Sequence, residues 1–247
     1  MLTGPWRIET FEVIDSTNAY VVARAREGAL EGLVVRADSQ LAGKGRLDRI
    51  WQDQPGSAML TSILLRPAVD ERHLQLVVAA VALSVREAVG HATGVLPDLK
   101  WPNDLQIDGK KVGGILAELV TTSSGPAVII GIGVNCSDHP SDVLTATDLL
   151  RATHVAVTPA ELLEATLEAL SQRRTLLDTP SGLTVVRSEY VSTLDTIGRR
   201  VVVQRPDGDV HADAIDIDET GALVIDVAGV RSVVHVGDIV HLRLEGA

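Results

Sequence analysis

Cysteine is scarce in this chain, and we find neither a long apolar run nor the pattern expected of a secretory leader. Its 247 residues contain one cysteine, Cys136, so no internal disulfide can form, and a small buried side chain is the expected role. The longest apolar run, Leu74 to Val85, contains Gln75 and Ser84 and falls short of the roughly 18 residues that a spanning helix needs. The N-terminus lacks the basic-then-apolar pattern of a signal peptide. We expect a cytoplasmic protein with no membrane segment.

An excess of basic residues is missing as well. The formal net charge is -11 at pH 7, and an acidic surface repels the phosphates of nucleic acid. Hydrophobic residues make up 45% of the chain, which is enough for one large domain and a small appendage. We place the larger domain at residues 1–194 and the smaller at 195–247.

Several catalytic signatures are absent too. Gly43-Lys44 is followed by Gly45 rather than Ser or Thr, so this stretch is not a nucleotide P-loop, and Asp48 occupies the third glycine position of a dinucleotide fingerprint. No Cys/His spacing typical of structural zinc occurs, and no Ser or Cys elbow indicates a hydrolase nucleophile. The residues that indicate a function must therefore belong to other motifs.

The first positive signal is the basic loop, residues 42–51, which combines two glycines, three cations and a closing tryptophan. The glycines are expected to allow positive φ and close backbone approach. Cations and backbone N–H groups around one short loop suit a phosphate or a carboxylate. A solvated surface turn explains the loop equally well when it is taken alone. The glycines are Gly43 and Gly45, and the cations are Lys44, Arg46 and Arg49.

Strand patterns recur through the first 194 residues. Asp108-Gly109 is a strong hairpin signal, and Pro102 forces Trp101 into an extended conformation, so a bend is expected there. The expected strands cover residues 10–14, 33–35, 58–65, 105–107, 111–119 and 127–132.

Helix signals alternate with these strands. Asp15 to Asn18 offers cap residues before a helix toward Arg26, and Thr158 with Pro159 and Glu161 forms a capping box with proline at the first helical position. Apolar residues at helical spacing predict a buried helix over 71–90. A further helix is expected over 183–194.

After Gly198 the pattern changes to short strands separated by turn residues. Such a run of close, short strands predicts a small barrel from about residue 195. The expected strands cover 200–204, 210–217, 223–227, 230–236 and 239–242.

Five blocks together resemble the biotin protein ligases in both order and spacing. The resemblance covers the chain from about Phe11 to Val240. It implies an α+β fold, with a mixed or antiparallel central sheet and helices of the class II synthetase-like, biotin/lipoate ligase type, and a small SH3-like C-terminal β-barrel. The blocks are Asp15-Ser16-Thr17-Asn18 with Gln40, residues 42–46 with Trp51, Lys-Trp-Pro-Asn-Asp at 100–104, Lys-Val-Gly-Gly-Ile-Leu-Ala-Glu at 111–118, and Gly-Ile-Gly-Val-Asn at 131–135.

The resemblance also implies an activity. That family activates biotin with ATP to form biotinyl-5'-AMP and pyrophosphate, then transfers biotin to a lysine of a carboxylase carrier domain. ATP and Mg²⁺ would enter as a substrate complex and biotin as a substrate, with no prosthetic group. Bringing a carboxylate to the α-phosphate opposes like charges, so the site needs cations. Arg46 and Lys111 are the expected catalytic residues, with Arg46 on a loop that closes over biotin and Lys111 on a strand.

The biotin site implied by the resemblance has a polar and an apolar part. The ureido ring is neutral, so short polar groups should read it. Ser16, Thr17 and Gln40 are expected there, and Trp51 is expected beside the apolar remainder, although ordinary packing explains Trp51 equally well. The expected biotin contacts are Ser16, Thr17, Asn18, Gln40, Gly43, Lys44, Gly45, Arg46, Trp51, Lys111, Gly114 and Ile115.

The implied ATP site overlaps the biotin site. Asp104 is the candidate metal ligand, because Mg²⁺ prefers oxygen ligands. Turn formation after Pro102 explains Asn103 and Asp104 equally well, and close strand packing is the alternative for Gly131 and Gly133. The expected ATP contacts are Arg46, Arg49, Trp51, Asn103, Asp104, Lys111 and Asn135.

Asp48 departs from the family pattern, which has glycine there. The aspartate adds a negative charge and a Cβ near the proposed phosphate site. We expect a leakier adenylate than glycine would give, so Asp48→Gly should slow adenylate release. Measuring release from the purified wild type and variant tests this, and equal rates would contradict it.

Other readings stay open at this point. A lipoate or octanoate ligase or transferase shares the implied fold, but its Arg-Ser-triple-Gly stretch and following His-Asp are absent. A noncatalytic biotin-binding sensor would not need Arg46 and Lys111. Some relatives carry an N-terminal DNA-binding domain, but the Ser16 block begins too soon for one, so we expect no operator binding. Some relatives pair through sheet edges, so a homodimer is also open.

Overall fold

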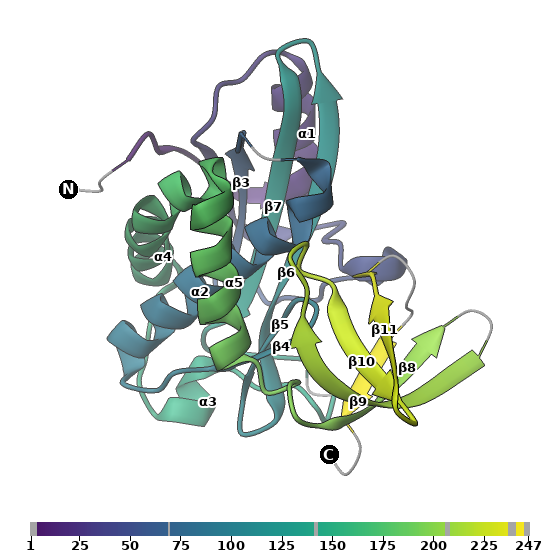
Figure 1. The fold of residues 1–247 in the computed structure, drawn as a ribbon. Helices are drawn as coiled ribbons and strands as arrows, with labels where there is room; N and C mark the ends of the chain where they lie inside the picture. Colours follow the sequence, from purple (N-terminus) through teal and green to yellow (C-terminus); the bar gives the residue numbers. More distant parts are fainter. Residues whose placement is uncertain (1–3, 69, 141–142, 206–207, 237–240, 245–247) are drawn as a thin grey trace.

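A mixed sheet of seven strands forms the centre of the molecule, in the order β1-β2-β3-β7-β6-β5-β4 (Figure 1). The computed structural model describes residues 4–68, 70–140, 143–205, 208–236 and 241–244, without the side chains of Asp48 and of residues 241–244. β1 runs parallel to β2, and all other neighbouring strands are antiparallel. The predicted mixed sheet is confirmed. The strands are β1 (Arg7–Ile14), β2 (Leu33–Gln40), β3 (Ala58–Leu65), β4 (Asp98–Lys100), β5 (Asp104–Ile107), β6 (Lys110–Thr122) and β7 (Gly125–Asn135).

Helices cover both faces of this sheet. Leu64 of β3 packs with Val21 and Ala25 on one face, whereas Ile63 and Leu65 join the cluster on the other. Successive strand residues point to opposite faces, so one strand serves two layers. α1 (Thr17–Arg26) lies on the first face, and α2 (Leu74–Thr93), α4 (Pro159–Arg174) and α5 (Pro180–Thr193) form the second layer. Short turns of 3-10 helix lie at Arg46–Asp48, Glu71–His73 and Thr175–Asp178.

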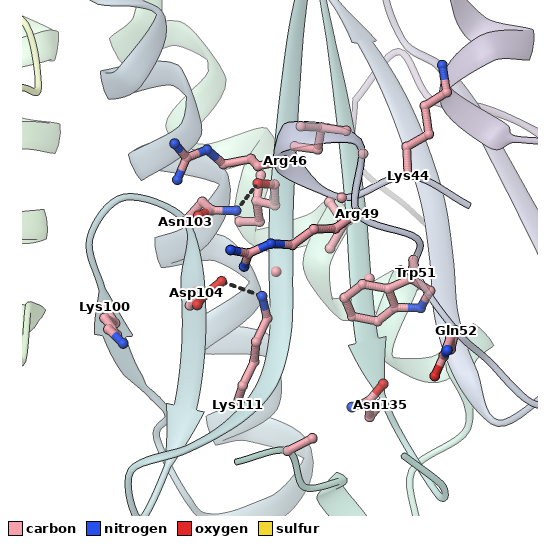
Figure 2. Close-up of a pocket in the computed structure, with 18 of the residues that line it drawn as sticks. Lys44, Arg46, Arg49, Trp51, Gln52, Lys100, Asn103, Asp104, Lys111 and Asn135 are labelled. Carbon is pink, nitrogen blue, oxygen red and sulfur yellow. Dashed lines mark hydrogen bonds and ion pairs between the residues drawn. The ribbon is translucent and has the colours of Figure 1, made fainter. Parts of the chain in front are cut away.

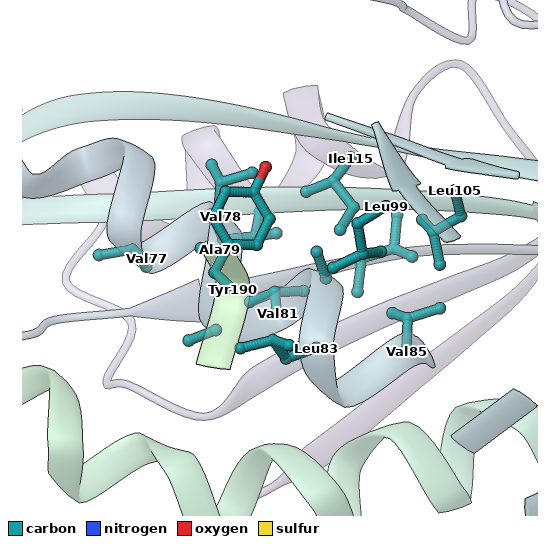
Figure 3. Close-up of a cluster of buried hydrophobic side chains, with 14 of the residues drawn as sticks. Val77, Val78, Ala79, Val81, Leu83, Val85, Leu99, Leu105, Ile115 and Tyr190 are labelled. Carbon is teal, nitrogen blue, oxygen red and sulfur yellow. The ribbon is translucent and has the colours of Figure 1, made fainter. Parts of the chain in front are cut away.

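α2 is the central element of the main core. Figure 3 shows Val78 and Val81 of α2 close to Leu99 and Ile115 of the sheet and to Tyr190 of α5. The segment Glu71–Thr93 is long and apolar enough to cross a membrane by length and composition, yet 67% of its most apolar window is buried inside the molecule. Its position in the core accounts for that composition.

The two helix starts predicted from capping residues are confirmed, whereas α2 begins at Leu74 rather than at 71 and α5 at Pro180 rather than at 183. Thr158 Oγ1 accepts from Glu161 N at 3.2 Å, and the Glu161 carboxylate accepts from Thr158 N at 3.0 Å. Ser16 caps α1 by accepting from Ala19 N at 3.4 Å. The helix α3 (Leu149–Thr153) was not predicted, since five residues are too few to show a helical period.

The C-terminal residues form a second, antiparallel sheet of five strands in the order β11-β10-β9-β8-β12. The predicted small β unit is therefore confirmed, with its edge strands β11 and β12 unpaired with each other among the described residues. Residues 239–240, the start of the last predicted strand, and the predicted turn at 237–238 lie outside the described residues. The strands are β8 (Arg200–Arg205), β9 (Gly208–Ile217), β10 (Leu223–Val227), β11 (Val230–Val234) and β12 (His241–Leu244).

Trp101 joins the two sheets. Its ring is buried, its Nε1 donates to Gly221 O at 3.1 Å, and its backbone N donates to Thr196 Oγ1 at 3.0 Å. Trp101 follows β4, so the bend predicted at Pro102 places this contact beside the end of the central sheet. Cys136 is buried as predicted, and burial raises the pKa of its thiol to about 11.

Candidate active site

A cavity of about 1130 Å³ opens on the α1 face of the central sheet, next to the N-terminal end of that helix. The basic loop, β6, β7, the turn before β5, and Pro140, Val143, Thr145 and Ala146 all contribute to its lining. Except for Gly43, every predicted site residue lines this cavity: Ser16, Thr17, Asn18, Gln40, Lys44, Gly45, Arg46, Arg49, Trp51, Asn103, Asp104, Lys111, Gly114, Ile115 and Asn135.

The cavity exists because α1 covers only part of its face of the sheet. Val120 and Ile129 pack against the helix, but closer to the helix start the sheet carries Gly131 and then Gly133. A glycine leaves room for another side chain to approach the strand backbone. The sheet floor is therefore open beside the N-terminal end of α1.

Two of these glycines accommodate side chains of the candidate site. A Cβ at Gly133 would lie 2.7 Å from Trp51 Cζ2, and a Cβ at Gly131 would overlap the Asn18 amide oxygen. Close strand packing, the alternative considered for both, applies instead to Gly113, whose Cβ would lie 2.8 Å from Gly133 O. The glycines at positions 131 and 133 of the sheet thus make room for Asn18 and Trp51 in the candidate site.

The basic loop folds as a tight hairpin. Gly45 N donates to Arg49 O at 2.7 Å, and Trp51 N donates to Gly43 O at 2.9 Å. Neither glycine uses the positive φ that it allows: the left-handed residue is Leu47, with φ of 55°, while Gly45 has φ of -107°. The hairpin thus places Arg49 opposite Gly45 and Trp51 opposite Gly43.

Gly43 contributes by close approach rather than by lining the cavity. A Cβ there would lie 3.1 Å from both Gln40 Nε2 and Trp51 O. A larger residue would push the loop away from Gln40. The side chain of Asp48 lies outside the described part of the chain.

Lys111 and Asp104 form a charged pair at one end of the cavity, opposite the end at the start of α1. Lys111 Nζ lies 2.5 Å from Asp104 Oδ1, and the two residues come from the adjacent strands β6 and β5. A Cβ at Gly114 would lie 3.2 Å from Lys111 Nζ, so this glycine leaves room for the lysine. Figure 2 shows Arg49 pointing toward the pair and Lys44 pointing away from it.

Arg46 extends from the same loop in another direction. Its Nη2 donates to Val236 O at 3.0 Å, just after β11. Burial lowers the pKa of its guanidinium, and this is opposed by Asp104 and reinforced by Arg49. Lys100 is affected in the same way, since burial lowers its pKa while Asp104 opposes the shift. The Asp104 carboxylate therefore interacts electrostatically with three basic residues, Arg46, Lys100 and Lys111.

The polar end of the cavity lies at the start of α1. Gln40 Oε1 accepts from Thr17 N at 2.8 Å and from Thr17 Oγ1 at 3.0 Å. Ser16 uses its hydroxyl as the helix cap, and Asn18 Nδ2 donates to Glu118 Oε1 at 2.8 Å. This end carries amides and hydroxyls, in contrast to the charged end near Lys111.

The two asparagines predicted for the ATP site each donate to the backbone. Asn103 Nδ2 donates to Ile115 O at 2.8 Å and Ile115 N donates to Asn103 O at 2.9 Å, which ties the turn before β5 to β6. Asn135 Nδ2 donates to Thr147 O at 3.0 Å. No group of three or more His, Cys, Asp or Glu side chains that could hold a metal ion occurs among the described residues.

Residues 143–148 are a part of the site that the sequence did not predict. Lys111 N donates to Thr145 O at 2.7 Å, and Thr147 N donates to Lys111 O at 2.8 Å, so this segment holds the backbone of Lys111. His139 Nδ1 lies 2.7 Å from Asp148 Oδ2 and closes the segment. Only Thr147-Asp148, as cap residues before α3, gave a local signal.

Comparison with known families now decides the classification. Residues 10–135 match the biotin/lipoate A/B protein ligase family, and residues 196–242 match the biotin protein ligase C-terminal domain. The chain belongs to the biotin/lipoate protein ligase family. The first match covers most of the seven-stranded sheet, and the second covers most of the five-stranded C-terminal sheet.

Individual relatives agree with this assignment. The biotin–[acetyl-CoA-carboxylase] ligase of Mycobacterium tuberculosis is 35% identical over 246 residues, which cover 96% of this chain and 90% of the relative. The bifunctional ligase/repressor BirA of Bacillus subtilis is 31% identical, over 87% of this chain and 68% of its own length. Among solved structures, the biotin protein ligase of Aquifex aeolicus in complex with biotin and ATP has a TM-score of 0.83 and 28% identity, covering 96% of this chain and 99% of that one.

Proposed function

We propose that this member of the biotin/lipoate protein ligase family is an ATP-dependent biotin ligase. It activates biotin to biotinyl-5'-AMP and transfers the biotinyl group to a lysine of a carboxylase carrier domain. The observation that carries this proposal is the polarity of one cavity. Hydroxyls and amides lie at the α1 end and cations at the Lys111 end, as suits a ligand with a neutral polar head and a carboxylate tail.

The polar end is assigned to the ureido ring. Thr17 and Gln40 supply short hydrogen-bonding groups without net charge, which matches a ring with two N–H donors and one carbonyl. Ser16 and Asn18 support them, since both side chains bond within the protein. Trp51 and the glycine floor supply the apolar wall between the two ends.

The cationic end is assigned to the reacting groups. Negative charge grows on the phosphorus oxygens as the biotin carboxylate attacks the α-phosphate, and fixed cations stabilise it. Lys111 is on a strand held on both sides, whereas Arg46 and Arg49 are on the basic loop. We assign Lys111 and Arg46 the catalytic role, with Arg49 on the phosphates.

Magnesium enters with the nucleotide. Asp104 offers one carboxylate, and Mg²⁺ keeps several waters and takes few protein ligands, so a single carboxylate fits that ion. Asn103 and Asn135 line the same end and are assigned to the nucleotide through their remaining amide oxygens.

The test uses the purified chain with biotin, ATP, Mg²⁺ and a carboxylase carrier domain, followed by an avidin blot. We expect a labelled carrier, and no label when the acceptor lysine is replaced by arginine. Exchange of labelled pyrophosphate into ATP identifies the activated acid. Dependence on octanoate would support a lipoate-type ligase, and biotin binding without exchange would support a sensor; either result contradicts the proposal.

A further inference from the structure

A chain of hydrogen-bonding side chains runs beneath the polar end of the cavity and ends at a carboxylate. Glu118 Oε1 accepts from Asn18 Nδ2 at 2.8 Å. Asn18 Oδ1 lies 2.5 Å from Ser62 Oγ, which lies 2.7 Å from Thr17 Oγ1. Thr17 then reaches Gln40, as described above. The five residues come from β6, α1, β3 and β2, so the chain crosses the sheet under the site.

The middle of this chain is buried. Ser62 is 0% exposed, Thr17 3% and Asn18 5%. Buried hydroxyls and amides are costly unless each is paired, and here each has a partner. Gly131 leaves the space that the Asn18 amide occupies. This glycine thus makes room for the Asn18 amide between Glu118 and Ser62.

The direction of each bond follows from the carboxylate. Ionised Glu118 can only accept, so the Asn18 NH₂ faces Glu118 and the Asn18 oxygen faces Ser62. Ser62 has one hydroxyl hydrogen and two oxygens within reach. When that hydrogen goes to Asn18, the nearer oxygen, the Thr17 hydroxyl donates to Ser62 Oγ, Gln40 Oε1 keeps the bond from Thr17 N, and both Thr17 lone pairs stay available to accept. If Asn18 turned, its NH₂ would donate to Ser62, the Ser62 hydrogen would occupy one of the two Thr17 lone pairs, and the Thr17 hydrogen would go to Gln40.

We propose that Glu118 is a positioning residue which, through Asn18 and Ser62, fixes the Thr17 hydroxyl as a hydrogen-bond acceptor for one ureido N–H of biotin. The inference rests on the proposed function. It assigns roles to Glu118 and Ser62, which lie outside the lining of the cavity. Glu118 determines which end of the Asn18 amide faces Ser62, and it does not touch the ligand itself.

The test measures equilibrium binding of biotin and of two analogues, each methylated on one ureido nitrogen. Glu118→Gln removes the obligate acceptor with little change in shape. It should weaken biotin binding about threefold to tenfold, the range expected for one hydrogen bond. The affinity for the analogue that lacks the N–H accepted by Thr17 should stay unchanged. The KM for biotin should rise while the KM for ATP and kcat at saturating biotin stay unchanged.

Two further variants make the result specific. Glu12→Gln removes a charge from an exposed residue of β1 and should leave biotin binding unchanged. In a Ser62→Ala background, Glu118→Gln should have no further effect, because no hydroxyl then links Asn18 to Thr17. An equal loss for biotin and both analogues, or no loss at all, would overturn the inference. A wild-type chain that neither binds nor activates biotin would instead overturn the proposed function.

Discussion

Lys111→Ala is expected to lower biotin-dependent exchange of pyrophosphate into ATP about 10²- to 10³-fold, the range measured for removing one group that stabilises developing charge. Lys111 Nζ lies 2.5 Å from Asp104, and its backbone is held by Thr145 and Thr147. Its ammonium is therefore already positioned before charge develops, which is the condition for a large effect. The loss should fall mainly on kcat, because the interaction strengthens in the transition state.

The neighbouring residue provides a matched control for this prediction. Lys110 is exposed at the start of β6, so Lys110→Ala removes the same charge one position away. It should keep the exchange rate of the wild type. Lys111→Arg should recover only part of the rate, because a planar guanidinium cannot replace a compact ammonium beside Asp104. Exchange by Lys111→Ala at the rate of Lys110→Ala would contradict the assigned role.

Patterns local in the chain were enough to predict most elements of the fold. The capping box at Thr158 and the cap at Ser16 both act within one helical turn, so their residues are neighbours in the sequence. The strand β3 was predicted over the residues it occupies, 58–65, because a short, mostly apolar run follows the turn residues Pro55-Gly56. α3 is too short for a period to show.

The site itself depends on contacts between distant residues, and here sequence patterns were less informative. Gly131 and Gly133 were noticed as a block, but their purpose depends on Asn18 and Trp51, more than 80 positions earlier in the chain. The bond from Arg46 to Val236 joins residues 190 positions apart and has no sequence signal. Resemblance to a family supplied the list of residues, and the physical reason for each came from the fold.

Gly133→Ala is the second change with a large expected effect, because it acts on the wall between the two ends of the cavity. The new Cβ would lie 2.7 Å from Trp51 Cζ2 and 2.8 Å from Cε2, so the indole must move off the sheet floor. Forcing an extra methyl into a filled space costs about 1–3 kcal/mol, which corresponds to a roughly tenfold to hundredfold loss of biotin affinity if the cost falls on the binding geometry.

A double-mutant cycle with Trp51→Ala separates this steric route from general damage to the sheet. If the indole is the only group displaced, Gly133→Ala should weaken biotin binding in the wild-type background and have little effect when Trp51 is already alanine. Titration calorimetry gives the four affinities, and thermal unfolding of the same four proteins reports the stability of β7. Additive losses of affinity, with a matching loss of stability, would show that Gly133 serves strand packing and that Trp51 does not form the wall of the biotin site.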